Sequence, residues 1–234
     1  MKLICEGKTK NVYENENGTL TLKLKDDATG KDGIFDPGEN QVGVSIKGLG
    51  RESLRLSVHY FEMIEASGIP THFIKCDINA AAMDVKPAQL FGKGVEFICR
   101  RKATGSFVRR YGEYVKCGDD LDFIVEVTLK DDARKDPLIT KDALVILKIM
   151  SPDEYETCAK FTRKIAQLIA TDLQNKGLEL YDLKLEFGKN NNEIILIDEV
   201  SAGCMRVYKH SKTIPPMDLG ALILNTVPIT GNMV

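Results

Sequence analysis

An alternating stretch near residue 180 carries the strongest chemical signal in the chain. Residues 181–187 (Tyr-Asp-Leu-Lys-Leu-Glu-Phe) switch between apolar and charged at nearly every position. That period of two predicts a strand with one buried face. It places Asp182, Lys184 and Glu186 together, so two carboxylates and an amine share one surface.

A second stretch is expected to run back beside the first. Residues 194–197 are apolar and are followed directly by Asp198 and a second acid. The intervening residues 189–193 (Lys-Asn-Asn-Asn-Glu) have the composition of a turn, so the two stretches predict a β-hairpin. Depending on which residues form the turn, Glu186 either pairs directly with Asp198 or is its diagonal neighbour, roughly 7 Å away or less.

Carboxylates at this separation repel each other unless a cation lies between them. Hard oxygen ligands suit Mg²⁺, which proteins commonly bind through one or two carboxylates together with nucleotide phosphates. The hairpin therefore makes Glu186 and Asp198 candidate metal ligands. The alternative is a solvated surface with ordinary charge alternation, and the hairpin alone does not separate the two.

The segment 7–13 (Gly-Lys-Thr-Lys-Asn-Val-Tyr) joins two predicted strands and is a candidate phosphate loop. It is not a P-loop, because the first glycine of that motif would fall on a lysine at position 2 and no helix follows. A glycine at a strand corner still lets backbone amides approach phosphates. Lys8 and Lys10 add positive charge, as in the phosphate-covering hairpin of kinase-like folds. A charged surface turn is the alternative.

A second candidate phosphate site combines Arg100 with residues 103–112, where a strand should lead into a short helix through a Gly-Ser corner at Ser106. Free amides at a helix start, a hydroxyl group and nearby guanidinium groups bind phosphate well. A solvated basic turn is the alternative. The charge-rich runs 26–33 and 130–137 have the same ambiguity.

The elements that must position these residues are readable from periodicity and turn composition. Helices are predicted at 51–67 and at 152–176, the second with a capping box from Ser151 to Glu154. Strands are predicted at 2–5, 11–14, 19–24, 71–75, 95–100 and 122–129. The glycine-rich stretch 26–50 is expected to be a long functional loop.

This order of strands, long helix and hairpin predicts an α+β architecture with antiparallel sheets in two lobes. We place the N-terminal lobe at residues 1–92 and the C-terminal lobe at 93–234. The apolar run 219–224 is expected to be a packed helix, with a subunit contact in a homodimer as the alternative.

The composition excludes several functional classes. The 234 residues are 43% hydrophobic and 28% charged with a net charge of −2, so nothing favours nucleic acid or a membrane surface as partner. No apolar run approaches the roughly 20 residues of a membrane span. Six scattered cysteines and no signal peptide predict a reducing, cytoplasmic location. With three histidines, catalysis should fall on Lys, Asp, Glu, Arg and backbone amides.

Five ordered motifs together resemble one family, that of phosphoribosylaminoimidazole-succinocarboxamide synthase (SAICAR synthetase). They are Gly-Lys-Thr-Lys-x-Val-Tyr at 7–13, Gly-Ser-Phe-Val-Arg-Arg-Tyr-Gly at 105–112, Lys-Asp-Asp-Ala…Asp-Pro at 130–137, Asp-x-Lys-Leu-Glu-Phe-Gly at 182–188 and Ile-Asp-Glu-Val-Ser…Arg at 197–206. The resemblance extends from residue 2 to about 209. It implies the kinase-like, two-lobed fold of that family, with an ATP cleft between the lobes.

The resemblance also implies an activity. Enzymes of this family use ATP to join L-aspartate to the carboxylate of 5-amino-1-(5-phosphoribosyl)imidazole-4-carboxylate, a step of purine (IMP) biosynthesis. The products are SAICAR, ADP and phosphate, and the expected intermediate is an acyl phosphate. ATP and Mg²⁺ are the implied cofactors, and the partners are small-molecule substrates.

Residue roles carry over where the motifs match. The implied catalytic residues are Lys184, Asp182 and Asp32. The implied ATP contacts are Gly7, Lys8, Lys10, Lys86, Glu96 and Lys130. The implied substrate contacts are Arg100, Ser106, Arg206, Asp136 and Ser201. Glu186 and Asp198 are the implied metal ligands, as the hairpin had suggested independently.

The chain departs from the family pattern in three places. The segment after the Asp-Glu pair usually reads Ser-Pro-Asp-x-x-Arg-x-Trp, whereas Gly203 stands here in place of the acid. The loop 28–50 and the tail after Tyr208 also differ. Gly203 and the altered tail leave a non-catalytic nucleotide-binding protein open as an alternative. A kinase-like phosphotransferase acting on a small molecule is the other, because the ATP-binding residues alone would suit it, although no His-Arg-Asp or Asp-Phe-Gly motif is present.

Overall fold

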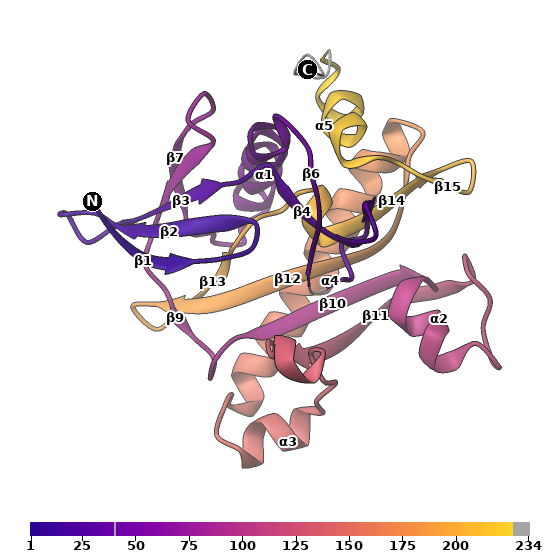
Figure 1. Ribbon diagram of the computed structural model, residues 1–234. Helices are drawn as coiled ribbons and strands as arrows, with labels where there is room; N and C mark the ends of the chain where they lie inside the picture. The colour runs from indigo at the N-terminus through magenta and orange to yellow at the C-terminus, as the bar shows by residue number, and fades with distance from the viewer. Residues whose placement is uncertain (40, 227–234) are drawn as a thin grey trace.

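A computed structural model describes residues 1–39 and 41–226 of the chain. Within these residues the strands form three antiparallel sheets, and helices pack on the two larger ones (Figure 1). The α+β class with antiparallel sheets, predicted from the element order, is confirmed. None of the helices in the described part is long and apolar enough to cross a membrane.

The N-terminal sheet has the strand order β1-β2-β3-β8-β7. Its strands are β1 (Lys2–Glu6), β2 (Lys10–Glu14), β3 (Leu20–Leu24), β7 (Phe73–Asp77) and β8 (Ala82–Val85). Only the inner strands bury a row of apolar side chains, including Leu22, Leu24 and Met83. The outer strands β1 and β2 are therefore free to carry polar residues toward the site.

The larger sheet has the order β11-β10-β12-β14-β15, and β13 and β9 also pair with β12. Its strands are β9 (Gln89–Leu90), β10 (Val95–Lys102), β11 (Asp120–Leu129), β12 (Glu179–Asn190), β13 (Glu193–Ile197), β14 (Met205–Lys209) and β15 (Lys212–Thr213). The long strand β12 crosses the middle of the molecule (Figure 1). Every strand of this sheet except β11 and β15 pairs with it directly.

The stretch 26–50 is not the long loop that its composition predicted. It forms a small sheet from β4 (Asp27–Lys31), β5 (Ile34–Phe35) and β6 (Val42–Ser45). The glycines permit close backbone approach, since a Cβ on Gly43 would lie 2.3 Å from the carbonyl carbon of Gly30. Glycine in this stretch therefore serves strand packing as much as turn formation.

Both predicted long helices are confirmed. The helices are α1 (Leu49–Ala66), α2 (Gly105–Tyr111), α3 (Lys141–Ile146), α4 (Pro152–Asn175) and α5 (Pro216–Leu224), with short 3₁₀ turns η1 (Asp132–Arg134) and η2 (Ala202–Cys204). The predicted capping box of α4 is present. Its apolar stripe, with Ile165, Ile169 and Leu173 buried, packs on β10, β11 and β12.

The C-terminal apolar run forms α5, which packs on α1 with Leu219 and Ile223 buried. Packing within the chain thus accounts for this run. The chain leaves the N-terminal sheet after Val85 and enters the larger sheet at Gln89. Since α1 contacts elements of both halves, the predicted lobe boundary at residue 92 stays a prediction.

Candidate active site

The β12–β13 hairpin forms, but in neither of the two registers predicted from the sequence. Glu186 pairs with Ile197, and Asn190 pairs with Glu193. The turn is therefore only Asn191 and Asn192, both with positive φ, of 49° and 66°. Two left-handed residues match the right-handed twist of a hairpin, and asparagine tolerates that conformation better than most residues.

Asp198 lies just beyond the end of β13 and has a φ of 70°. Strand alternation would have turned its side chain away from the face of Glu186, and the left-handed backbone turns it back. The buried ring of His72 holds this conformation, because its Nε2 donates to the Asp198 carbonyl over 2.9 Å. Burial lowers the pKa of His72 to about 4, so the ring is neutral.

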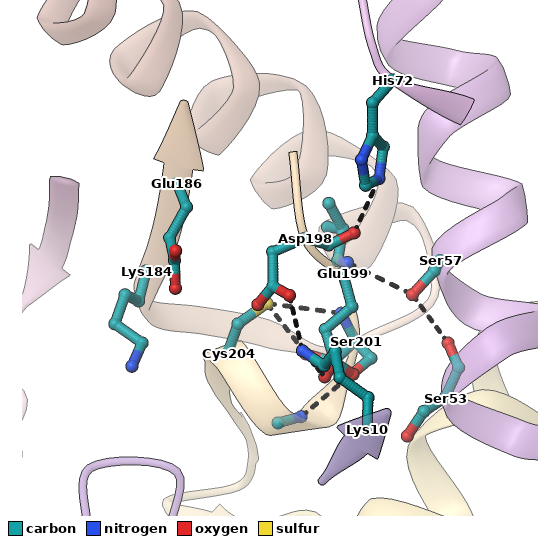
Figure 2. A network of polar contacts seen from close by, with 12 residues as sticks. Lys10, Ser53, Ser57, His72, Lys184, Glu186, Asp198, Glu199, Ser201 and Cys204 are labelled. Atoms are coloured by element: carbon teal, nitrogen blue, oxygen red, sulfur yellow. Dashed lines mark hydrogen bonds and ion pairs between the residues drawn. The ribbon is translucent and has the colours of Figure 1, made fainter. Parts of the chain in front are cut away.

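Two lysines neutralise the acids at the centre of the site. Lys10 Nζ lies 2.6 Å from Asp198 Oδ1 and 2.8 Å from Glu199 Oε1. Lys130 Nζ lies 2.6 Å from Glu186 Oε1. Figure 2 shows Lys10 facing the acidic pair, with Glu186 and Lys184 on the neighbouring strand.

The pKa values of the two candidate metal ligands move in opposite directions. Burial and the nearby Asp198 carboxylate raise the pKa of Glu186, and Lys130 only partly opposes them. Burial would also raise the pKa of Asp198, but Lys10 and Lys130 outweigh it and the pKa falls well below its usual range. Mutual repulsion between the carboxylates is what a bound cation would relieve.

The phosphate-loop candidate is the turn between β1 and β2. The Gly7 amide donates to the Lys10 carbonyl over 2.9 Å, and a Cβ on Gly7 would lie 2.7 Å from that oxygen. Lys25 Nζ donates to the Gly7 carbonyl. Lys8 pairs with Asp132 across the cleft at 2.7 Å. Glycine is needed here because the turn closes on itself.

Lys184 is held by Glu96 on the adjacent strand β10. Its Nζ donates to Glu96 Oε1 over 2.9 Å, and Thr128 Oγ1 donates to the other carboxylate oxygen over 2.9 Å. Burial alone would lower the pKa of Lys184, but the Glu96 carboxylate outweighs it and the pKa is raised. Lys184 is therefore a fixed, fully protonated cation.

The arginines of the second phosphate candidate are anchored on carboxylates. Arg100 is 1% exposed and donates to Asp182 Oδ2 over 3.0 Å and to Ser106 Oγ over 2.9 Å. Arg206 donates to the same Asp182 oxygen over 2.7 Å and to Asp36 Oδ1 over 2.7 Å. Asp182 therefore orients two guanidinium groups, which is a positioning role.

Two adjoining cavities contain most of the predicted residues. The larger, about 640 Å³, is lined by a basic set: Arg100, Arg109, Arg110, Lys135, Lys184 and Arg206. The smaller, about 360 Å³, is lined by Gly7, Lys8, Lys10, Lys130, Glu186 and Asp198. Both are also lined by Pro37, Glu39, Glu96, Asp132, Asp136, Lys184 and Cys204. We call this set the shared wall.

Three predicted site residues line neither cavity. Asp32 is exposed in the β4–β5 turn, with a φ of 52°. Lys86 is exposed and donates to the Thr71 carbonyl over 3.2 Å. Ser201 is buried, donates to Glu199 and accepts the Gly203 amide. Of these, Ser201 contacts the site indirectly, through its hydrogen bond to Glu199, which lines the smaller cavity. The structure does not bring Asp32 or Lys86 to either cavity.

Sequence reasoning missed Asp36 and Glu39, which lie in the segment between β5 and β6. The sequence feature that could have drawn attention to them is Asp36-Pro37-Gly38, which is typical of a turn. It lies inside the stretch 26–50, which its composition predicted to be one loop. The role of Asp36 depends on Arg206, 170 residues further along the chain, and no local pattern reveals that contact.

The site is suited to a metal that also takes ligands from a bound anion. Among residues 1–39 and 41–226 no group of three or more His, Cys, Asp and Glu side chains could hold a metal ion alone. Glu186 and Asp198 supply two carboxylates. That donor set fits Mg²⁺, which usually completes its coordination with water and phosphate oxygens.

Fold and site together define an α+β protein whose two adjoining cavities, lined by lysines and arginines, are suited to polyanionic ligands. A family model described as SAICAR synthetase matches residues 3–218. A phosphoribosylaminoimidazole-succinocarboxamide synthase from Clostridium tetani is 51% identical over 226 residues, covering 96% of this chain and 100% of the relative. The same enzyme of Aquifex aeolicus is 35% identical, covering 90% and 94%. The chain belongs to the SAICAR synthetase family.

Solved structures agree with this assignment. A SAICAR synthetase in complex with ADP superposes with a TM-score of 0.85 at 27% identity, covering 97% of this chain and 99% of that one. The SAICAR synthetase of Pyrococcus horikoshii OT3 gives a TM-score of 0.82 at 26% identity, covering 94% and 100%. The predicted family resemblance and fold are both confirmed.

Proposed function

We propose that this protein is an ATP-dependent ligase that joins L-aspartate to the carboxylate of 5-amino-1-(5-phosphoribosyl)imidazole-4-carboxylate and forms SAICAR, ADP and phosphate. Family membership supports the overall reaction. The observation that supports the assignment of this reaction to the site is that the two cavities share one set of lining residues, the shared wall. It joins an acid- and lysine-lined cavity to an arginine-lined cavity, with Lys184 at the junction.

The smaller cavity is the proposed ATP site. The Gly7–Lys10 turn supplies backbone amides and two cations for the phosphates, and Lys130 adds a third. Glu186 and Asp198 would hold Mg²⁺, which lowers the charge repulsion against an attacking carboxylate when bound. Lys10 and Lys130 now neutralise these acids and would turn toward the phosphates. The solved relative with bound ADP supports a nucleotide site in this fold.

The larger cavity is the proposed ribotide site. Arg100, Ser106 and Arg206 present donors that Asp182 and Asp36 hold in fixed positions. Fork-shaped guanidinium groups match the oxygens of a phosphate well. With the 5′-phosphate at these arginines, the imidazole carboxylate would extend toward the shared wall.

Lys184 is proposed to stabilise the negative charge that develops where the terminal phosphate meets that carboxylate. A fixed donor aimed at developing charge commonly contributes a factor of about 10²–10³ to the rate. Glu96 and Thr128 hold Lys184 in place, so no reorganisation is needed during the reaction. The carboxylate oxygen takes the terminal phosphoryl group of ATP, and ADP leaves. The aspartate amino group, once it has lost a proton, attacks the carbonyl carbon of the acyl phosphate, so that an amide bond forms and phosphate leaves.

The deciding experiment measures ADP release with Mg·ATP and the ribotide, with and without L-aspartate. The ligase requires all three substrates and yields SAICAR in equal amount to ADP. ADP release with phosphorylated acceptor and no need for aspartate would instead identify a phosphotransferase. Nucleotide binding without turnover would identify a non-catalytic protein. No finding supports either of these two alternatives.

We further propose a cytoplasmic location, consistent with six free cysteines. The partners would be small molecules. A homodimer stays a prediction that light scattering can test.

A further inference from the structure

Glu39 lies on the shared wall, and its carboxylate makes no hydrogen bond or ion pair with the described residues. It is half-buried and lines both cavities. A carboxylate in this position must be neutralised by solvent or by a ligand. Because Glu39 lines both cavities, a positively charged group of a ligand bound where they meet could pair with it.

The other acids of the shared wall already have partners. Glu96 accepts from Lys184 and Thr128. Asp132 pairs with Lys8. Asp136 accepts the Asp131 amide over 2.7 Å and has a further interaction. Among the acids that the structure describes on this wall, Glu39 is thus the one whose negative charge is uncompensated.

The segment that carries Glu39 is anchored. The Glu39 amide donates to the Asp36 carbonyl over 3.2 Å, and the Asp36 side chain accepts from both Gly38 and Arg206. Gly38 leaves room for the Arg206 guanidinium group, since a Cβ there would lie 2.1 Å from Arg206 Nη2. The arginine that lines the larger cavity therefore also positions Glu39.

We propose that Glu39 binds the α-ammonium group of L-aspartate, an inference that rests on the proposed function. Ligation occurs at the shared wall, so the amino group must arrive there. In water near neutral pH that group is a cation, and a carboxylate partner compensates its desolvation with an ion pair as well as a hydrogen bond. Arg109 and Lys135 also line the larger cavity and have no ion pair within the described residues, so positive charge is available nearby for the two carboxylates.

The test is steady-state kinetics of Glu39→Gln with the other two substrates saturating. The KM for L-aspartate should rise roughly 10- to 100-fold, as expected for loss of one charged contact. The KM values for ATP and ribotide should stay within about twofold. Inhibition by succinate, which has both carboxylates but no ammonium group, should be equal in the variant and the wild type. Glu16→Gln, an exposed acid outside both cavities, is the matched control.

Each other outcome overturns the inference. An unchanged KM for L-aspartate removes Glu39 from the amino-acid site. An increased Mg²⁺ requirement would make Glu39 a metal ligand. Equal weakening of succinate and aspartate would indicate a structural role, which Glu39→Asp should partly rescue. If wild-type protein needs no aspartate, the proposed function itself fails, and that failure is visible before any variant is made.

Discussion

The charged side chains of this site are held in place by contacts between residues that lie far apart in the sequence. Lys10 from the N-terminal sheet holds Asp198, 188 residues away. Arg206 binds both Asp182 of β12 and Asp36, which lies between β5 and β6. Each bridge pairs one cation with two carboxylates, so removal of one carboxylate still leaves the cation paired with the other.

For Asp198→Asn we expect turnover to fall by about 10²-fold or more, because a candidate metal ligand loses its charge. The fold should survive, since Lys10 keeps Glu199 as its partner. Ligase assays and thermal unfolding of the same preparation check both points. A variant with near wild-type rates would contradict the assignment of Asp198 as a metal ligand.

For Arg206→Ala we expect the KM for the ribotide to rise roughly 10- to 100-fold, the size of one lost charged contact. The KM for ATP should change little, because Arg206 does not line the smaller cavity. Arg101→Ala is the control, since Arg101 pairs with Glu179 and lines neither cavity. An unchanged ribotide KM would remove Arg206 from the phosphate site.

At the scale of elements, the β12–β13 hairpin decides where the carboxylates meet. The two-residue turn fixes the register, and the left-handed backbone at Asp198 corrects the direction of its side chain. Sequence composition located the hairpin within a residue or two. A shift of one residue reverses the face of every side chain, so that accuracy was insufficient to place Asp198.

The turn itself can be tested at Asn192, which is exposed and has a φ of 66°. Asn192→Gly should be neutral or stabilising, because glycine adopts positive φ without a steric cost. Asn192→Val should lower the free energy of unfolding by about 1–2 kcal/mol. Urea denaturation of the pair measures the difference, and equal stability of both variants would contradict the turn geometry.

At the scale of the whole molecule, the proposed nucleotide contacts come from both sheets. Gly7 and Lys10 belong to the N-terminal sheet and its turn, whereas Glu186 and Asp198 come from the larger sheet and the end of its hairpin. A ligand that binds all of them ties the two halves together. It should therefore stabilise the entire fold rather than one part.

We expect Mg·ADP at 100 times its dissociation constant to stabilise the protein by roughly 2.7 kcal/mol, which for a chain of this length raises Tm by roughly 5–10 °C. Excess EDTA should remove most of the shift, and Asp198→Asn should respond to ADP equally with and without Mg²⁺. Scanning calorimetry checks this. A full shift that persists in EDTA would argue against metal-assisted nucleotide binding.

Local sequence patterns were sufficient to predict much of the secondary structure and the family of the protein. The capping box and apolar stripe defined α4, and charge alternation placed Asp182, Lys184 and Glu186 on one face of β12. Five ordered motifs identified the family. These features depend on neighbours within a few residues, which hydrogen-bonding and side-chain periodicity constrain directly.

Only the tertiary structure decided which charges meet. It showed that the glycine-rich stretch is a small sheet and that Asp32 and Lys86 lie away from the cavities. It also brought Asp36 and Glu39 to the arginines and Lys184. Such contacts join residues more than a hundred positions apart, and they are set by how sheets pack and strands register, which no local pattern encodes.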